Sequence, residues 1–315
     1  MKKMTALLMI ISLLILLFSC SDEREKVSPE KTDIRNPLVF KHNNQEFKIF
    51  TFYQDFEDFL KKAEKQPDNL EELYQESVVE AFSLVHGYAY KNYWMFTTPS
   101  DTKALKESID ALVNKRDRIN DLIVEALKES ADQLPGGDKS IYLLPAIPEF
   151  KPDLQILNYV TGEAWNKNTI IILIDPSFVE EHLQYNIAHE YHHVVAMEHS
   201  SAYTLLERSI LEGKADAFAE MVYPKVHVPW SEPLTGQAKE KAWKSFTQNL
   251  NSTDNNLWKE FLNGNPSKGI EYWSNYKIGY QIMKSFLEEN PEVSIGEWTQ
   301  LPAEDILKKS EYRVK

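Results

Sequence analysis

The sequence predicts an α+β domain in which a small mixed sheet lies between two largely helical parts. Two observations lead to this fold class. Apolar residues recur three and four positions apart in residues 55–132 and again after residue 179, which is the period of an amphipathic helix. Between these parts, residues 140–175 contain short β-branched runs separated by Pro and Gly, as strands do. Helices, strands and again helices are typical of an α+β protein.

The N-terminus has the features of a bacterial lipoprotein signal. Two lysines precede an apolar run at residues 6–18, which is shorter than the roughly 20 residues that cross a membrane as a helix. The run ends in Leu-Phe-Ser-Cys, which resembles a lipobox, the signal in which a lipid is attached to the cysteine and cleavage makes it the new N-terminus. We therefore expect a signal peptide at residues 1–19 and a lipid anchor on Cys20 in the cell envelope. The serine that follows favours the outer membrane.

A tether and a hairpin are expected next. Residues 20–40 are charged, contain two prolines and show no periodicity, as flexible linkers do. We place the folded domain at residues 41–315. Residues 39–53 mix β-branched and aromatic residues around His-Asn-Asn-Gln, which favours a hairpin or the start of a strand.

The periodicity of residues 55–132 predicts about three helices. It is interrupted near Pro99, where Ser100 or Asp101 can cap the next helix. Pro-Gly-Gly-Asp at residues 135–138 then ends the helical part.

Three short runs predict strands, at residues 140–144, 154–160 and 169–175. Gly-Glu-Ala-Trp at residues 162–165 fits either a simple turn or an edge strand to which a peptide adds by strand pairing. Helix dominates from residue 179 to the end of the chain.

The composition excludes several classes of protein. The chain has 35 Lys and Arg against 48 Asp and Glu, a net charge of -13, whereas a nucleic-acid-binding protein needs a positive surface. Loss of residues 1–19 removes two lysines and no acid, so the mature chain carries -15. Anionic lipid head groups repel such a body, so the lipid has to hold it at the membrane. A single cysteine excludes internal disulfides and a Cys-rich zinc site.

A metal-binding motif follows the predicted strands. Residues 189–193 read His-Glu-Tyr-His-His and match H-E-x-x-H. Histidines four apart share a helix face, so His189 and His193 can bind one Zn²⁺, and Glu190 is placed to act on a water at the metal. The alternative is that these histidines only pack on an amphipathic helix. His192 points about 100° away from His193, so we expect it to pack rather than to bind metal.

Two histidines leave a catalytic zinc site one protein ligand short. Glu212 and Asp216, four apart in the next predicted helix, resemble the gluzincin pattern, in which the Glu binds zinc and the Asp holds a ligand histidine. The rival is His199, ten residues after His189, as in the metzincin signature. Ala196 occupies the glycine position of that signature, where the chain turns sharply, and alanine disfavours a turn with positive φ. We therefore expect Glu212 to be the third ligand.

These motifs resemble the bacterial YjaZ-like family of predicted zinc-dependent proteases, which are gluzincin-like. The matching segments are Ala-His-Glu-Tyr-His-His-Val-Val at residues 188–195, Leu-Glu-Gly-Lys-Ala-Asp at residues 211–216 and Tyr-Lys-Ile-Gly-Tyr-Gln-Ile at residues 276–282. With the strands before the motif, the resemblance spans about residues 140–290, which we take as the catalytic core. It implies a zincin-like fold and peptidase activity but supplies no substrate.

Three tyrosines stand at helical spacing near the C-terminus, Tyr272, Tyr276 and Tyr280. Such a stripe often belongs to a core. Of the three, we take Tyr276 as the candidate that donates a hydrogen bond to the oxyanion.

The sequence thus predicts a membrane-anchored zinc metallopeptidase that acts on a peptide or protein substrate. His189, His193 and Glu212 would bind Zn²⁺, Glu190 would move the proton, and Asp216 would fix His189. The alternative is a zinc-binding envelope lipoprotein that binds or assembles partners without cleaving them. The intact Glu190 argues against it, because a purely structural site has no use for a general base. A passive lipoprotein without metal is the third option.

Overall fold

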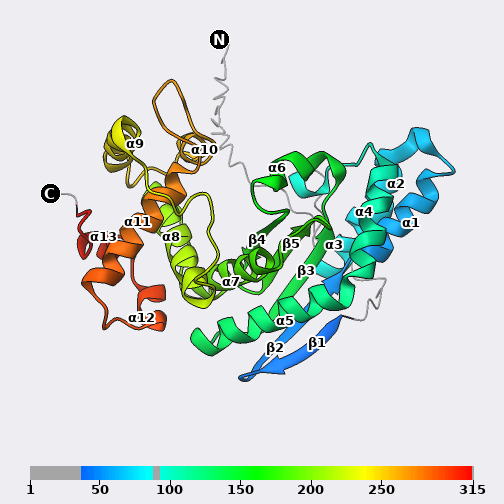
Figure 1. Cartoon of the computed structure of the whole chain (residues 1–315), viewed down its shortest axis with the longest axis horizontal. Coiled ribbons are helices and arrows are strands. Elements are labelled where there is room, and N and C mark those ends of the chain that lie inside the picture. Colours follow the sequence, from blue (N-terminus) through cyan, green and yellow to red (C-terminus); the bar gives the residue numbers. More distant parts are fainter. Residues whose placement is uncertain (1–36, 88–92, 314–315) are drawn as a thin grey trace, which may run out of the picture.

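The computed structural model describes residues 37–87 and 93–313, with N-terminal helices at one end of the molecule and C-terminal helices at the other (Figure 1). The expected signal peptide, Cys20 and most of the expected tether lie outside these residues. Strand β1 (Leu38–His42) already begins inside the range expected for the tether. Within the described residues, none of the helices combines the length and the apolar character needed to span a membrane.

The predicted hairpin is confirmed. β1 pairs antiparallel with β2 (Gln45–Thr51). Asn43 and Asn44 connect the strands with φ of 48° and 66°. A two-residue hairpin turn needs this left-handed backbone at both positions, and asparagine tolerates it better than most residues. Phe47 and Ile49 of β2 are buried in the core.

The helical part that follows is more divided than expected. Its helices are α1 (Tyr53–Ala63), α2 (Leu70–Tyr74), α3 (Glu80–His86), α4 (Thr102–Asn114) and α5 (Arg116–Gln133), with a π-helical turn at Gln75–Val79. The chain leaves the helix near Pro67, which begins a short 3-10 turn, and again at Gly87, whose φ is 87°. Asp101 accepts a hydrogen bond from the backbone N–H of Ala104 at 2.9 Å, so the predicted cap of α4 is confirmed.

The sheet has five strands in the order β1-β2-β3-β5-β4. Its remaining strands are β3 (Lys139–Pro145), β4 (Val160–Asn166) and β5 (Thr169–Ile174). β3 pairs parallel with both β2 and β5, whereas β4 is an antiparallel edge strand. The edge-strand interpretation of residues 162–165 is therefore confirmed, and the sheet is mixed as predicted.

The prediction of a strand at residues 154–160 is wrong. A short helix, α6 (Lys151–Gln155), occupies its start, because Pro152 in the first turn fixes a helical φ. The chain then turns at Asn158 and Tyr159, whose φ values are 55° and 66°, and β4 begins only at Val160. The apolar run alternated like a strand but lacks the extended backbone.

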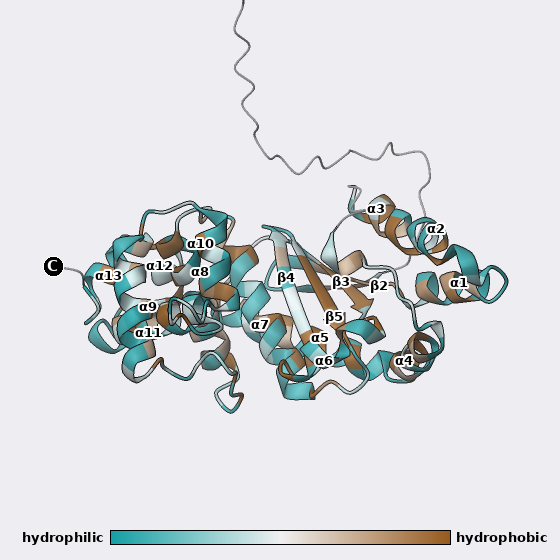
Figure 2. Ribbon diagram, turned by 90° about the horizontal axis from the view of Figure 1, so that it is seen from above, coloured by the Kyte–Doolittle hydropathy of each residue, from teal (hydrophilic) through white to brown (hydrophobic). Residues whose placement is uncertain are grey.

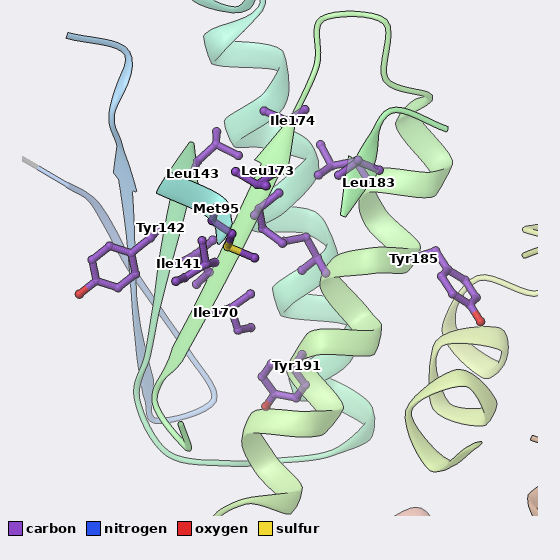
Figure 3. Packing of buried hydrophobic residues seen from close by; sticks show 14 of the residues in the cluster. Met95, Ile141, Tyr142, Leu143, Ile170, Leu173, Ile174, Leu183, Tyr185 and Tyr191 are labelled. Atoms are coloured by element: carbon purple, nitrogen blue, oxygen red, sulfur yellow. The ribbon is translucent and has the colours of Figure 1, made fainter. Parts of the chain in front are cut away.

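Helices cover both faces of the sheet. α5 and α7 (Glu180–Ala196) pack against each other on one face, where Ile141 and Ile170 lie between strands and helices (Figure 3). Tyr142 points to the opposite face, and its ring lies 5.3 Å from that of Phe82 in α3. β5 is hydrophobic along its whole length, whereas β4 is paler at the sheet edge (Figure 2). The core therefore lies on both sides of β3 and β5, and β4 keeps an open edge.

The C-terminal part is helical, as expected. It consists of α8 (Leu205–Val222), α9 (Gly236–Gln248), α10 (Asn255–Asn263), α11 (Ser274–Glu289), α12 (Ile295–Gln300) and α13 (Ala303–Lys308). α8 packs against both α7 and α11. The α8–α11 crossing is unusually close: a Cβ atom on Gly279 would lie 1.8 Å from the carbonyl oxygen of Ser209, and one on Gly213 would lie 2.2 Å from that of Gly279. Two glycines thus let the two backbones touch.

Candidate metal centre

The motif histidines lie in the second half of α7, with their rings facing α8. Glu180 and Glu181 in the first turn favour the start of this helix, because acidic groups interact well with its N-terminal dipole. His189 and His193 are about 5% and 6% exposed. Their rings lie 4.6 Å apart, and their Nε2 atoms are separated by 3.0 Å. Both nitrogens therefore converge on one point.

Glu212 on α8 completes this group. Its Oε2 lies 3.1 Å from Nε2 of His193 and 3.4 Å from Nε2 of His189. These residues form the group among the described residues whose atoms are placed to hold a metal ion. In a tetrahedral zinc site with bonds of about 2.0–2.1 Å, the ligand atoms lie about 3.3 Å apart. The three separations and the two imidazoles with one carboxylate therefore fit Zn²⁺.

Asp216 lies behind His189, as expected from the gluzincin pattern. Its Oδ1 accepts the Nδ1–H of His189 at 2.9 Å, and the hydroxyl of Tyr185 donates to the same oxygen at 3.1 Å. With the proton on Nδ1, the Nε2 lone pair of His189 faces Glu212 and His193. This is the tautomer that a metal ligand needs. Tyr185 is a contact that the sequence did not reveal, although it stands one helical turn before His189.

The charges of this cluster are strongly coupled. Burial lowers the pKa of His189, but Asp216 and Glu212 outweigh it and hold this pKa well above its usual value. Burial raises the pKa of Glu212, and the imidazoles of His193 and His189 overcome this effect, so its pKa lies below the usual range. A divalent cation would take over the role that these protons play, because metal binding to histidine displaces protons.

Glu190 lies between α7 and the edge strand. Its side chain is about 5% exposed, and burial raises its pKa against the opposing effect of the imidazoles of His189 and His193 and of the backbone N–H of Ala164 in β4. A Cβ atom on Gly162 would lie 2.6 Å from Cγ of Glu190 and 2.6 Å from Oδ1 of Asn186. The glycine in β4 therefore lets α7 come close enough to place this carboxylate beside the strand.

Of the three tyrosines, Tyr276 faces the centre. Its ring lies 6.5 Å from that of His189, and its pKa is raised by burial and by the nearby charge of Glu212. Tyr280 instead donates to Glu220, and Tyr272 is half-exposed. Of the three tyrosines, the one chosen from the sequence is therefore the one that lies beside the centre.

The remaining histidines of this region stay outside the centre. His199 is exposed, and α7 continues through Ala196, so the turn that a third histidine would need is absent at this point. His192 is buried, stacks on Trp298 at 5.3 Å, and its Nε2 lies 3.2 Å from the hydroxyl of Thr299. The interpretation of His192 as a packing residue is therefore confirmed.

Comparison with known proteins gives one family. The family model described as "Predicted Zn-dependent protease (DUF2268)" matches residues 119–308, which include most of α5, the strands β3, β4 and β5, and the helices α7, α8 and α11. No curated protein and no solved structure matches the chain. The match covers more than half of the sequence and contains every residue of the metal centre. The chain therefore belongs to the family of predicted Zn-dependent proteases and has the mixed α+β architecture of a zincin-like domain.

Proposed function

We propose that the protein is a zinc-dependent peptidase. The convergence of His189, His193 and Glu212, with Glu190 beside them, carries this proposal. A structural zinc site is usually closed by four protein ligands, whereas a catalytic site has three and keeps one position open. The described residues supply three ligands here. Membership of the family of predicted Zn-dependent proteases supports the same activity.

In the proposed reaction, the protein moves one proton and stabilises one charge. Zn²⁺ in such a site supplies a Lewis acid that polarises a peptide carbonyl and lowers the pKa of water toward 7. Glu190 takes a proton from the attacking water as its oxygen bonds to the carbonyl carbon. The same carboxyl then gives the proton to the leaving amine as the C–N bond breaks. Asp216 keeps His189 in its ligand tautomer, and Tyr276 donates a hydrogen bond to the developing oxyanion.

The open edge of β4 is the proposed place for the substrate backbone. β4 pairs with β5 on one side, and its residues from Thr161 to Trp165 are half-buried. An extended peptide can add to such an edge as a further strand. The carboxylate of Glu190 lies against this strand, so the peptide would run past the proposed base.

We also propose that a lipid on Cys20 anchors the peptidase in the cell envelope, in the outer membrane. Support comes from the apolar run, the lipobox-like end and the position of the only cysteine. A Cys20→Ser variant should leave the membrane fraction, and the mass of the mature N-terminal peptide should show the lipid in the wild-type protein alone. Recovery of Cys20→Ser in the membrane would contradict the anchor.

Ligand assignment and hydrolysis can be tested with one set of variants. Glu212→Ala should lose zinc, measured by elemental analysis of the purified protein, whereas the matched control His199→Ala should keep it. The opposite pattern would favour the metzincin-like ligand set. A panel of quenched peptides should be cleaved by wild-type protein and protected by a chelator. Uniform inactivity of the zinc-loaded protein would favour a binding or assembly role instead.

A further inference from the structure

A cavity of about 70 Å³ lies beside the metal centre, next to the N-terminal half of α7. His189 and Glu190 belong to its lining. The other walls come from the segment before β4, from the start of β4, from the loop between α8 and α9, and from Tyr276 of α11. A peptide whose scissile bond lies beside Glu190 would therefore place one of the side chains next to that bond in this cavity.

The walls of this cavity are partly apolar and partly polar. The polar side chains are those of Asn158, Thr161, His182, Tyr185, Asn186 and Tyr276, together with His189 and Glu190 of the centre. Its apolar lining consists of Leu157, Val160, Val228, Pro229 and Trp230. Among the described residues that line it, Glu190 is the one carboxylate, and no Lys or Arg is present. Burial of an unpaired charge is strongly unfavourable. The cavity therefore favours an uncharged side chain.

The size of the cavity further limits which substrate side chains can enter it. An apolar cavity of about 150 Å³ holds one benzene molecule. The cavity beside the metal centre has about half that volume. It accommodates a branched aliphatic side chain or a methionine more easily than a benzyl or indole group.

Trp230 is the largest side chain of the wall, and its position is fixed from two sides. Its ring lies 5.1 Å from that of Trp273 and 5.3 Å from that of Tyr276. The backbone N–H and the hydroxyl of Ser231 both donate to the carbonyl oxygen of Val228, at 3.1 and 2.9 Å. Gln281 of α11 donates to the carbonyl oxygen of Ser231 at 3.3 Å. The indole is thus held in place before a substrate arrives.

We propose that this cavity selects an uncharged aliphatic side chain of medium size, such as Leu, Ile, Val or Met, next to the scissile bond, and that Trp230 sets the upper size limit. This inference rests on the proposed peptidase function and adds a substrate class to it. Asp216 and Tyr276 contribute to the cleavage reaction itself, whereas Trp230 determines which substrate residue lies next to the scissile bond.

The test uses zinc-loaded protein and dipeptide hydroxamates that differ only in the side chain next to the zinc-binding group. Calorimetry should show that the leucyl compound binds wild-type protein about tenfold more tightly than the phenylalanyl compound, because pockets discriminate by this order for small changes in size. Trp230→Ala should reverse that order. Trp258→Ala removes an indole that packs on Arg208 of α8, outside this wall, and should keep the wild-type order. Trp230→Leu keeps an apolar wall and should shift the preference partway, even where Trp230→Ala fails to fold.

Equal binding of leucyl, phenylalanyl and lysyl compounds to wild-type protein would overturn the proposal. The same holds for an unchanged order in both Trp230 variants. A cleavage profile of a peptide mixture, read by mass spectrometry, is the second measurement. If hydroxamates are discriminated but no peptide is cleaved, the pocket assignment stands and the proposed peptidase function fails.

Discussion

The close crossing of α8 and α11 makes a strong prediction for Gly279→Ala. The added Cβ would lie 1.8 Å from the carbonyl oxygen of Ser209, and real Cβ atoms are essentially never found within 3.0 Å of another atom. The helices would have to separate by about 1.2 Å, which is the difference between these two distances. Overpacking of this kind costs about 3 kcal/mol. For a domain of this size, that lowers the melting temperature by about 5 °C.

The same displacement would move Tyr276, which precedes Gly279 by less than one turn, away from Glu212. A shift of about 1 Å in a catalytic group can lower turnover by about a hundredfold. Thermal unfolding and peptide turnover of Gly279→Ala should therefore both fall. Gly296→Ala in α12 is the matched control, since its Cβ meets no atom within 4 Å, and it should melt at or slightly above the wild-type temperature. A Gly279→Ala protein that melts within 2 °C of wild type would refute the close crossing.

Three further predictions concern the surroundings of the centre. Tyr185→Phe removes one hydrogen bond to Asp216 and should weaken zinc binding by a few-fold to tenfold, measured by competition with a chelating dye, with Asp216→Asn losing more. Glu198→Gln leaves the buried ammonium of Lys139 without its carboxylate and should cost about 3 kcal/mol in urea unfolding, and a cost below 1 kcal/mol would count against this ion pair. Zinc affinity should fall on acidification, because Asp216 and Glu212 raise the pKa of His189 against the effect of burial. Protons should therefore begin to compete with the metal at a pH above the usual histidine pKa, and more strongly as the pH falls. A pH-independent affinity between pH 5 and 8 would contradict this.

Local spacing predicted the two pairs of the site because each pair lies on one helix, and the resemblance to the gluzincin pattern connected the pairs. His189 and His193 stand four apart, and so do Glu212 and Asp216, so the helical period alone puts each pair on one face. The predicted pairing of His189 with Asp216 is found at 2.9 Å. His199 could be set aside for a local reason too, because alanine at position 196 disfavours the sharp turn with positive φ that the metzincin signature needs.

The parts that sequence reasoning missed depend on contacts between distant segments. Trp230 and Tyr276 meet across 46 positions of the chain, and no periodicity links them. The choice of Tyr276 over Tyr280 could not be checked by helical spacing, because it depends on the register of α11 against α8. The wrong prediction of a strand at residues 154–160 has a related cause. The alternation of apolar residues is a local pattern, and it did not reveal the left-handed backbone at Asn158 and Tyr159.

The most direct test of the account is to measure zinc content and peptide hydrolysis of Glu190→Gln beside the wild-type protein. Glu190 lies against β4 and is not one of the three ligands, so the variant should retain one zinc per chain. It should lose hydrolysis by at least about a hundredfold, because the amide cannot accept the proton of the attacking water. Wild-type hydrolysis by zinc-loaded Glu190→Gln would contradict the proposed role of this carboxylate and with it the central claim.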